Sequence, residues 1–126
     1  VKERKSNLLA ILNKLKNSNH KILGYGAPAK ATTLLNAFGI DSTILDYIID
    51  DNPLKHDKII PKVNIPIYSK DKVVDSETEH IVILAWNFYK EIIKNNKDLL
   101  DVGVEFIVPT QEIKIINKDN YMEEIG

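Results

Sequence analysis

The chain has 126 residues, which suits one domain that buries roughly two-thirds of its extended surface. Its formal charge of -1 creates no strong field for nucleic acid or an anionic membrane, and no apolar run reaches membrane-spanning length. The absence of cysteine excludes disulfides, thiolate metal sites and cysteine nucleophiles, and the scattered histidines lack zinc-motif spacing. We therefore expect a cytoplasmic protein with no metal site and no nucleic-acid or membrane partner.

The first part of the chain predicts a helix followed by a strand. Apolar residues from Leu8 to Leu15 recur at helical spacing among charged residues. Residues 1–19 are therefore expected to form an amphipathic N-terminal helix with a solvated basic face. Residues 21–26 predict a short strand that runs into a glycine turn.

The middle of the chain alternates in the same way. Pro28 stands near the start of a second helix, where its missing N–H costs nothing, and Gly39 closes that helix. Residues 44–49 predict a second strand. A proline-punctuated loop follows, with an edge strand expected at residues 65–67 and a short helix over residues 69–74.

The last part of the chain completes an α/β pattern. Residues 81–85 are continuously apolar, as in a strand covered on both faces. Asn87 is expected to cap a helix that turns Phe88 toward the sheet, residues 104–108 predict a fourth strand, and residues 118–126 predict a frayed polar tail. The alternation predicts a Rossmann-like three-layer α/β domain over residues 20–117, with a mostly parallel sheet of about four to five strands.

A glycine-rich turn carries the clearest chemical signal. Residues 24–29 match G-x-G-x-x-A between a predicted strand and a predicted helix. The first glycine permits a tight turn, the second lets backbone approach a phosphate, and the small third residue lets helix and strand pack closely. The helix N-terminus offers N–H donors, to which Lys30 and Thr33 add a charge and a hydroxyl. The alternative is a tight turn that binds nothing, and Pro28 removes one donor.

Further candidates follow the second and third strands. Asp50 lies where a dinucleotide-binding half holds a ribose hydroxyl, although Asp50 and Asp51 also suit a simple turn. Trp86 and Asn87 follow the strand at residues 81–85, at the edge where open α/β sheets bind ligands. Packing for Trp86 and helix capping for Asn87 are equally good interpretations.

No catalytic set emerges from the remaining residues. Lys55 and His56 lie in the proline-punctuated loop, which could fold over a ligand, but a solvent-exposed His56 without function is the better interpretation. The sequence contains no serine–histidine–acid grouping and no P-loop. We therefore expect this domain to bind and position a ligand without performing bond chemistry.

Three blocks of sequence form a specific set: GYGAPAKATTLLN at residues 24–36, DDNPLK at residues 50–55 with Pro61 and residues 65–67, and LAWNF at residues 84–88. In this order they resemble the C-terminal domain of S-adenosylmethionine-dependent sugar-nucleotide C-methyltransferases. The chain departs from the family pattern where glycines are usual, in the neighbourhood of Asp57 and at Lys62. The sequence therefore leaves the path of this loop open.

The resemblance implies a part of a longer enzyme with a zinc-binding N-terminal domain and a central domain that binds S-adenosylmethionine. Such enzymes methylate the carbon next to the keto group of a nucleotide-linked keto-deoxy sugar, through an enolate. This chain would bind the nucleotide sugar beside the central domain, with no catalytic residue or cofactor of its own. The implied substrate-binding residues are Gly24, Gly26, Ala27, Lys30, Thr33, Asp50, Lys55, Trp86 and Asn87.

Two other functions remain open at this stage. A nicotinamide- or coenzyme-A-type domain would use the same loop, with Asp50 on a ribose hydroxyl. A structural or interaction domain would retain the turn as a vestige and bind no nucleotide.

Overall fold

The computed structural model describes residues 2–17, 21–26, 31–60, 62–71, 78–85, 88–109 and 113–125. No helix within these ranges is both long and apolar enough to cross a membrane. The elements, in chain order, are α1 (Lys2–Asn17), β1 (Lys21–Tyr25), α2 (Ala31–Phe38), β2 (Ile48–Ile49), the 3-10 turn η1 (Pro53–Lys55), β3 (Ile59–Ile60), β4 (Ile65–Tyr68), β5 (Thr78–Ile83), α4 (Tyr89–Lys94), α5 (Lys97–Asp101), β6 (Glu105–Pro109), β7 (Ile113–Ile116) and α6 (Tyr121–Ile125).

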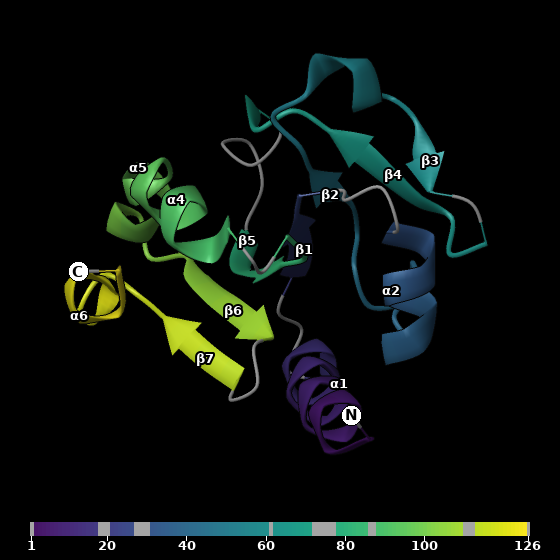
Figure 1. The fold of residues 1–126 in the computed structure, drawn as a ribbon, viewed down its shortest axis with the longest axis horizontal. Coiled ribbons are helices and arrows are strands. Elements are labelled where there is room, and N and C mark those ends of the chain that lie inside the picture. The colour runs from purple at the N-terminus through teal and green to yellow at the C-terminus, as the bar shows by residue number, and fades with distance from the viewer. Residues whose placement is uncertain are drawn as a thin grey trace.

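One sheet runs through the domain, with the strand order β3-β4-β2-β1-β5-β6-β7 (Figure 1). The five inner strands are parallel, whereas β3 and β7 pair antiparallel with their neighbours. The predicted count of four to five strands is therefore wrong, since the sheet has seven. The pairings among the five inner strands are parallel, but the sheet as a whole is mixed, because an antiparallel strand closes each edge.

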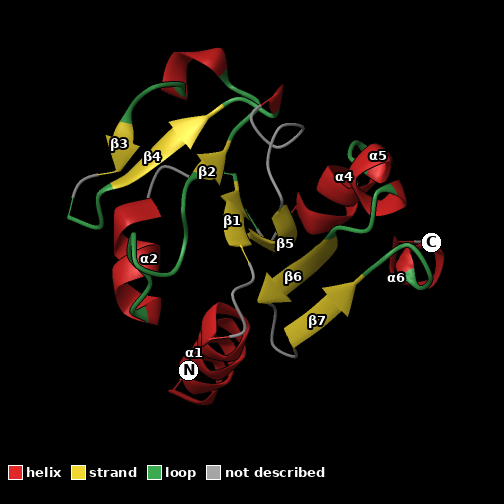
Figure 2. Cartoon of the chain, turned by 180° about the vertical axis from the view of Figure 1, so that it is seen from behind, coloured by secondary structure: helices red, strands yellow, loops and turns green. Residues whose placement is uncertain are grey.

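Helices pack on both faces of the sheet because successive strand residues point to opposite sides. In β1, Ile22 belongs to the core on one face and Leu23 to the core on the other. The first core takes Leu12 of α1 and Leu35 of α2, and the second takes Ile93 of α4. Figures 1 and 2 show α2 beside β2 and β4, and show α4, α5 and α6 gathered beside β6 and β7.

The second strand is shorter than the expected residues 44–49. Asp41 accepts hydrogen bonds from the Ile44 and Leu45 backbone N–H groups at 3.0 and 3.1 Å, which holds this stretch in a turn. Contact with β1 begins at Asp46, whose N–H donates to the Ile22 carbonyl at 3.1 Å. Only Ile48 and Ile49 form the strand. A side chain's apolarity predicts its burial but not whether its backbone is extended.

The strand expected at an edge, residues 65–67, lies inside the sheet as β4, between β3 and β2. Proline is tolerated there because of the direction of the backbone donors. The Ile67 N–H points to β3 and donates to the Lys58 carbonyl at 2.8 Å. Because successive backbone N–H groups of a strand point to opposite neighbours, the Pro66 nitrogen faces β2. Pairing between β2 and β4 begins only at Ile67, so the missing N–H of Pro66 costs no hydrogen bond of the sheet.

The C-terminal third differs from expectation in four ways. The helix expected after Asn87 is divided into α4 and α5, and Phe88, expected to face the sheet, is 62% exposed. Strand β7 is an addition, pairing along β6 from Phe106–Ile116 to Pro109–Ile113. The expected polar tail contains α6, whose Tyr121 packs against the second core. Residues 72–74, half of the helix expected over residues 69–74, lie outside the described residues.

The loop before β4 keeps a glycine-like path without glycine. Asp57 and Lys62 have φ values of +64° and +69°, in the left-handed region that glycine adopts most easily. These are the neighbourhoods in which the resembling family has glycine. The Asp57 N–H donates to the Ile67 carbonyl at 2.8 Å, which ties the loop to β4 and supports this conformation.

We predict that helix α1 is integral to the domain. Leu12 is fully buried, so Leu12→Ala should lower the free energy of unfolding by about 2–5 kcal/mol. Urea denaturation measures this loss. Asn13→Ala, on the exposed side of the same helix, is the control and should change stability by no more than about 0.5 kcal/mol. Equal stability of the two variants would mean that α1 does not stabilise the core.

A second prediction concerns the left-handed residues. Lys62→Gly should raise the free energy of unfolding by up to about 1 kcal/mol, because glycine relieves the cost of the positive φ. Lys58→Gly, at an exposed position without a positive φ, should instead cost about 0.5–1 kcal/mol. Destabilisation by both substitutions would contradict the left-handed path at Lys62.

Candidate functional site

The carboxyl ends of the parallel strands β1, β2 and β5 meet at one edge of the sheet. The Gly26 N–H donates to the Ile49 carbonyl at 2.7 Å, and the Leu84 N–H donates to the Tyr25 carbonyl at 2.9 Å. The chain passes from β1 to β2 on one side and reaches β5 on the other. Open α/β sheets bind ligands outside the carboxyl ends of their strands where the strand order reverses in this way. The carboxyl edge at β1, β2 and β5 is therefore the candidate site.

Close packing disfavours a side chain at both glycines of the turn, and most strongly at Gly26. A Cβ on Gly24 would lie 3.0 Å from Ile48 Cγ1 and 3.1 Å from Leu84 Cδ1. Gly26 has a φ of +87°, and a Cβ there would lie 2.8 Å from the Cβ of Ala85. The sequence motif predicts that the second glycine lets the backbone approach a phosphate. The fold gives an additional reason, which is the contact between the end of β1 and the chain after β5.

Asp50 organises the turn after β2. It is buried, and its Oδ1 accepts a hydrogen bond from the Asn52 N–H at 2.8 Å. Its Oδ2 lies 3.9 Å from the Lys55 ammonium, and its carbonyl accepts from His56 Nε2 at 2.6 Å. The half-buried His56 therefore closes the turn and is not the solvent-exposed residue that was expected. These contacts fix the loop over the end of β2.

Asp51 accepts a hydrogen bond from the side chain of a buried tyrosine. The Tyr25 hydroxyl lies 2.8 and 2.9 Å from the two carboxylate oxygens of Asp51, to which it donates. Burial raises the pKa of the Tyr25 phenol far above its usual range, and the Asp51 carboxylate acts in the same direction, whereas a hydrogen bond with Asn96 opposes them. The phenol therefore remains protonated and keeps donating. Sequence reasoning missed Tyr25, because spacing does not signal a contact between residues so far apart in the chain.

The structure brings part of the predicted residue set together. Gly24, Gly26, Asp50 and Lys55 lie at the carboxyl edge, and Thr33 is exposed in the first turn of α2, the helix that follows β1. The other predicted substrate-binding residues lie outside the described residues; they are Ala27, Lys30, Trp86 and Asn87.

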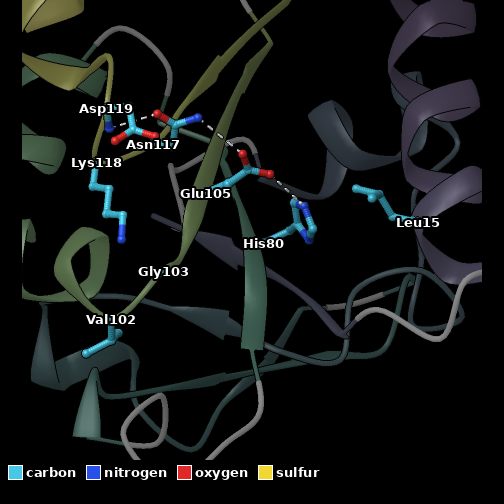
Figure 3. A pocket seen from close by; sticks show the side chains of 8 residues that line it. All are labelled: Leu15, His80, Val102, Gly103, Glu105, Asn117, Lys118 and Asp119. Atoms are coloured by element: carbon cyan, nitrogen blue, oxygen red, sulfur yellow. Dashed lines mark hydrogen bonds and ion pairs between the residues drawn. The ribbon is translucent and has the colours of Figure 1, made fainter.

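A cavity of about 580 Å³ lies at the opposite edge, where β5 and β6 begin. Figure 3 shows a hydrogen-bonded chain along its wall: His80 Nε2 lies 3.1 Å from Glu105 Oε1, and Asn117 Nδ2 donates to Glu105 Oε2 at 3.3 Å. These contacts link β5, β6 and the end of β7. None of the described site residues lines the cavity, so it does not coincide with the carboxyl edge. We interpret the chain of side chains as structural.

Two comparisons with known proteins agree on a family. The profile of the C-methyltransferase C-terminal domain matches residues 1–110. The C-methyltransferase NovU of Streptomyces niveus is 37% identical over 99 residues, which cover 79% of this chain but only 24% of that relative. The crystal structure of UDP-D-quinovosamine 4-dehydrogenase from Vibrio fischeri matches with a TM-score of 0.50 and 19% identity, covering 81% of this chain and 97% of that chain. The last similarity concerns the fold alone.

The packing of the glycine turn can be tested by stability measurements. Gly26→Ala combines a strained φ with the Ala85 contact, whereas Gly103→Ala has a φ of +101° and no atom within 4 Å of the new Cβ. We expect Gly103→Ala to cost about 1–2 kcal/mol of unfolding free energy and Gly26→Ala to cost more. Adding Ala85→Gly to Gly26→Ala should recover most of the difference. Equal losses for the two alanine variants would contradict the contact.

Proposed function

The chain belongs to the family of C-methyltransferase C-terminal domains, and we propose that it binds the nucleotide-sugar substrate of such an enzyme. The proposed substrate is a nucleotide-linked keto-deoxy sugar. A central domain of the same polypeptide would bind S-adenosylmethionine, the methyl donor. The present domain would carry no catalytic residue and would hold the sugar against that central domain.

The strongest support is the meeting of three strand ends with a glycine turn at a reversal of strand order. The parallel strands follow the order β4-β2-β1-β5-β6, which is the order of a Rossmann-like sheet whose ligand crevice lies beside β1. The turn from β1 leads toward the N-terminus of α2, where backbone donors favour a diphosphate. The domain therefore combines the sheet edge at which open α/β folds bind ligands with membership of a methyltransferase family.

Positioning is the task that this chemistry requires of a binding domain. The ketone makes the neighbouring C–H acidic, so a base in the central domain would remove that proton and the enolate carbon would attack the donated methyl group. Holding the sugar in the reactive geometry supplies much of such an acceleration. The proposed contacts of this domain come from the glycine turn with Lys30 and Thr33, from the loop after β2 with Lys55, and from Trp86 and Asn87.

A second candidate is a Rossmann-like interaction domain with a vestigial site. The contact of Gly26 with Ala85 explains that glycine without any phosphate. The Asp50 carboxylate already accepts a hydrogen bond from the Asn52 N–H. This contact also argues against a nicotinamide- or coenzyme-A-type function, which would place Asp50 on a ribose hydroxyl. Ligand binding separates these functions.

Isothermal titration calorimetry tests the proposal. The full polypeptide is titrated with dTDP-glucose and, in parallel, with NAD and coenzyme A. We expect saturable binding of the sugar nucleotide and no heat from the other two. Lys30→Ala should weaken that binding by roughly 1–3 kcal/mol, the scale of a charge-assisted hydrogen bond. Lys97→Ala, an exposed lysine of α5, is the control and should bind normally.

Each alternative result identifies another function. Binding of NAD or coenzyme A in place of the sugar nucleotide would overturn the proposed substrate while keeping the fold. Silence with all three ligands in a folded protein would favour the interaction domain. Normal sugar-nucleotide binding by Lys30→Ala would remove that lysine from the site.

A further inference from the structure

We infer that Asp51, held in place by Tyr25, accepts a hydrogen bond from a hydroxyl group of the bound nucleotide sugar, and that Asp50 stabilises the turn instead. This inference rests on the proposed function and adds the residue that recognises the ligand's hydroxyl. The neighbouring acids Asp50 and Asp51 are both candidates from sequence, and their surroundings separate them.

The Asp50 carboxylate is occupied by its own loop. Its side chain is only 11% exposed, one oxygen accepts the Asn52 N–H at 2.8 Å, and the other faces Lys55 Nζ at 3.9 Å. The buried carboxylate therefore leaves a ligand hydroxyl little room to approach. A hydroxyl that took the place of the Asn52 N–H would cost the turn that hydrogen bond, so binding through Asp50 would carry a structural penalty.

The Asp51 carboxylate, in contrast, lies on an exposed residue with acceptor capacity in reserve. Both of its oxygens lie within 2.9 Å of the Tyr25 hydroxyl, whose single proton satisfies only part of the carboxylate. An ionised carboxylate offers about four lone-pair positions. Asp51 can therefore accept a hydrogen bond from a ligand hydroxyl without losing its hydrogen bond from Tyr25.

Tyr25 gives Asp51 a fixed position before any ligand arrives. Its side chain is 3% exposed and packs in the second core, so the phenol is anchored in the sheet and not in the loop. A carboxylate held in one rotamer loses less conformational entropy on binding than one on a free surface side chain. Tyr25 is thus a positioning residue that acts through Asp51.

The negative charge of Asp50 and Asp51 also orients the ligand. A carboxylate accepts hydrogen bonds but repels phosphate, so two acids after β2 disfavour the diphosphate there. The N-terminus of α2, reached from the end of β1, has the opposite polarity. The hydroxyl-bearing part of the ligand therefore lies over the end of β2, with its diphosphate toward the turn between β1 and α2.

Calorimetry of Asp51→Asn tests the assignment. The amide keeps one acceptor oxygen for Tyr25 and removes the charge-assisted acceptor offered to the ligand. We expect the dissociation constant for dTDP-glucose to rise about tenfold to a hundredfold. Asp46→Asn is the matched control, because this exposed aspartate precedes β2 at the opposite edge and pairs with Lys16, and its binding should be unchanged.

A second ligand identifies the source of the hydroxyl. With dTDP, which lacks the hexose, Asp51→Asn should bind like the wild type if the hydroxyl belongs to the sugar, and should remain weakened if it belongs to the deoxyribose. An unchanged dissociation constant for both ligands, in a variant that melts normally, would overturn the assignment to Asp51 while leaving the proposed function intact. Failure of the wild-type protein to bind dTDP-glucose would overturn both.

Tyr25→Phe separates positioning from mere structural support. The variant should weaken dTDP-glucose binding, but it should add little to the loss already caused by Asp51→Asn, because both changes act on one contact. A general structural defect would instead weaken binding by the same factor in both backgrounds. That additive result would overturn the positioning role of Tyr25.

Discussion

The contact between the end of β1 and the chain after β5 constrains the rest of the structure. Gly26 has a positive φ and leaves no room for a side chain against Ala85. The same residue donates its N–H to Ile49, so one residue joins three strand ends. Any larger residue would separate them and open the edge at which the candidate site lies. Packing and ligand access therefore impose the same requirement on this position.

Asp50 and Asp51, the two acids that follow β2, show how a fold gives neighbouring residues different roles. Asp50 is drawn inward by the backbone N–H of Asn52 and by Lys55. Asp51 is turned outward, where the Tyr25 phenol meets it. Successive side chains at the end of a strand point to opposite faces of the sheet. Two residues of one type consequently have different surroundings and, in our proposal, different roles.

The loop between η1 and β4 shows that a backbone conformation can be retained where the residue differs from the glycine usual in the family. Asp57 and Lys62 adopt the left-handed conformation that glycine would take at lower cost. Pairing of the loop with β4, including the hydrogen bond from Asp57 to Ile67, offsets that cost. The sequence left this path open because residue preferences are weaker than the sum of such tertiary contacts.

The sequence by itself determined the α/β class, the parallel inner strands and the glycine turn, since apolar runs such as residues 81–84 and the glycine spacing depend on local rules. Only the tertiary structure decided the edge strands β3 and β7, the short β2 and the inner place of β4. These depend on which backbone groups find partners far along the chain. The link between Tyr25 and Asp51 has the same origin, because it arises only when parallel strands bring distant residues to one edge.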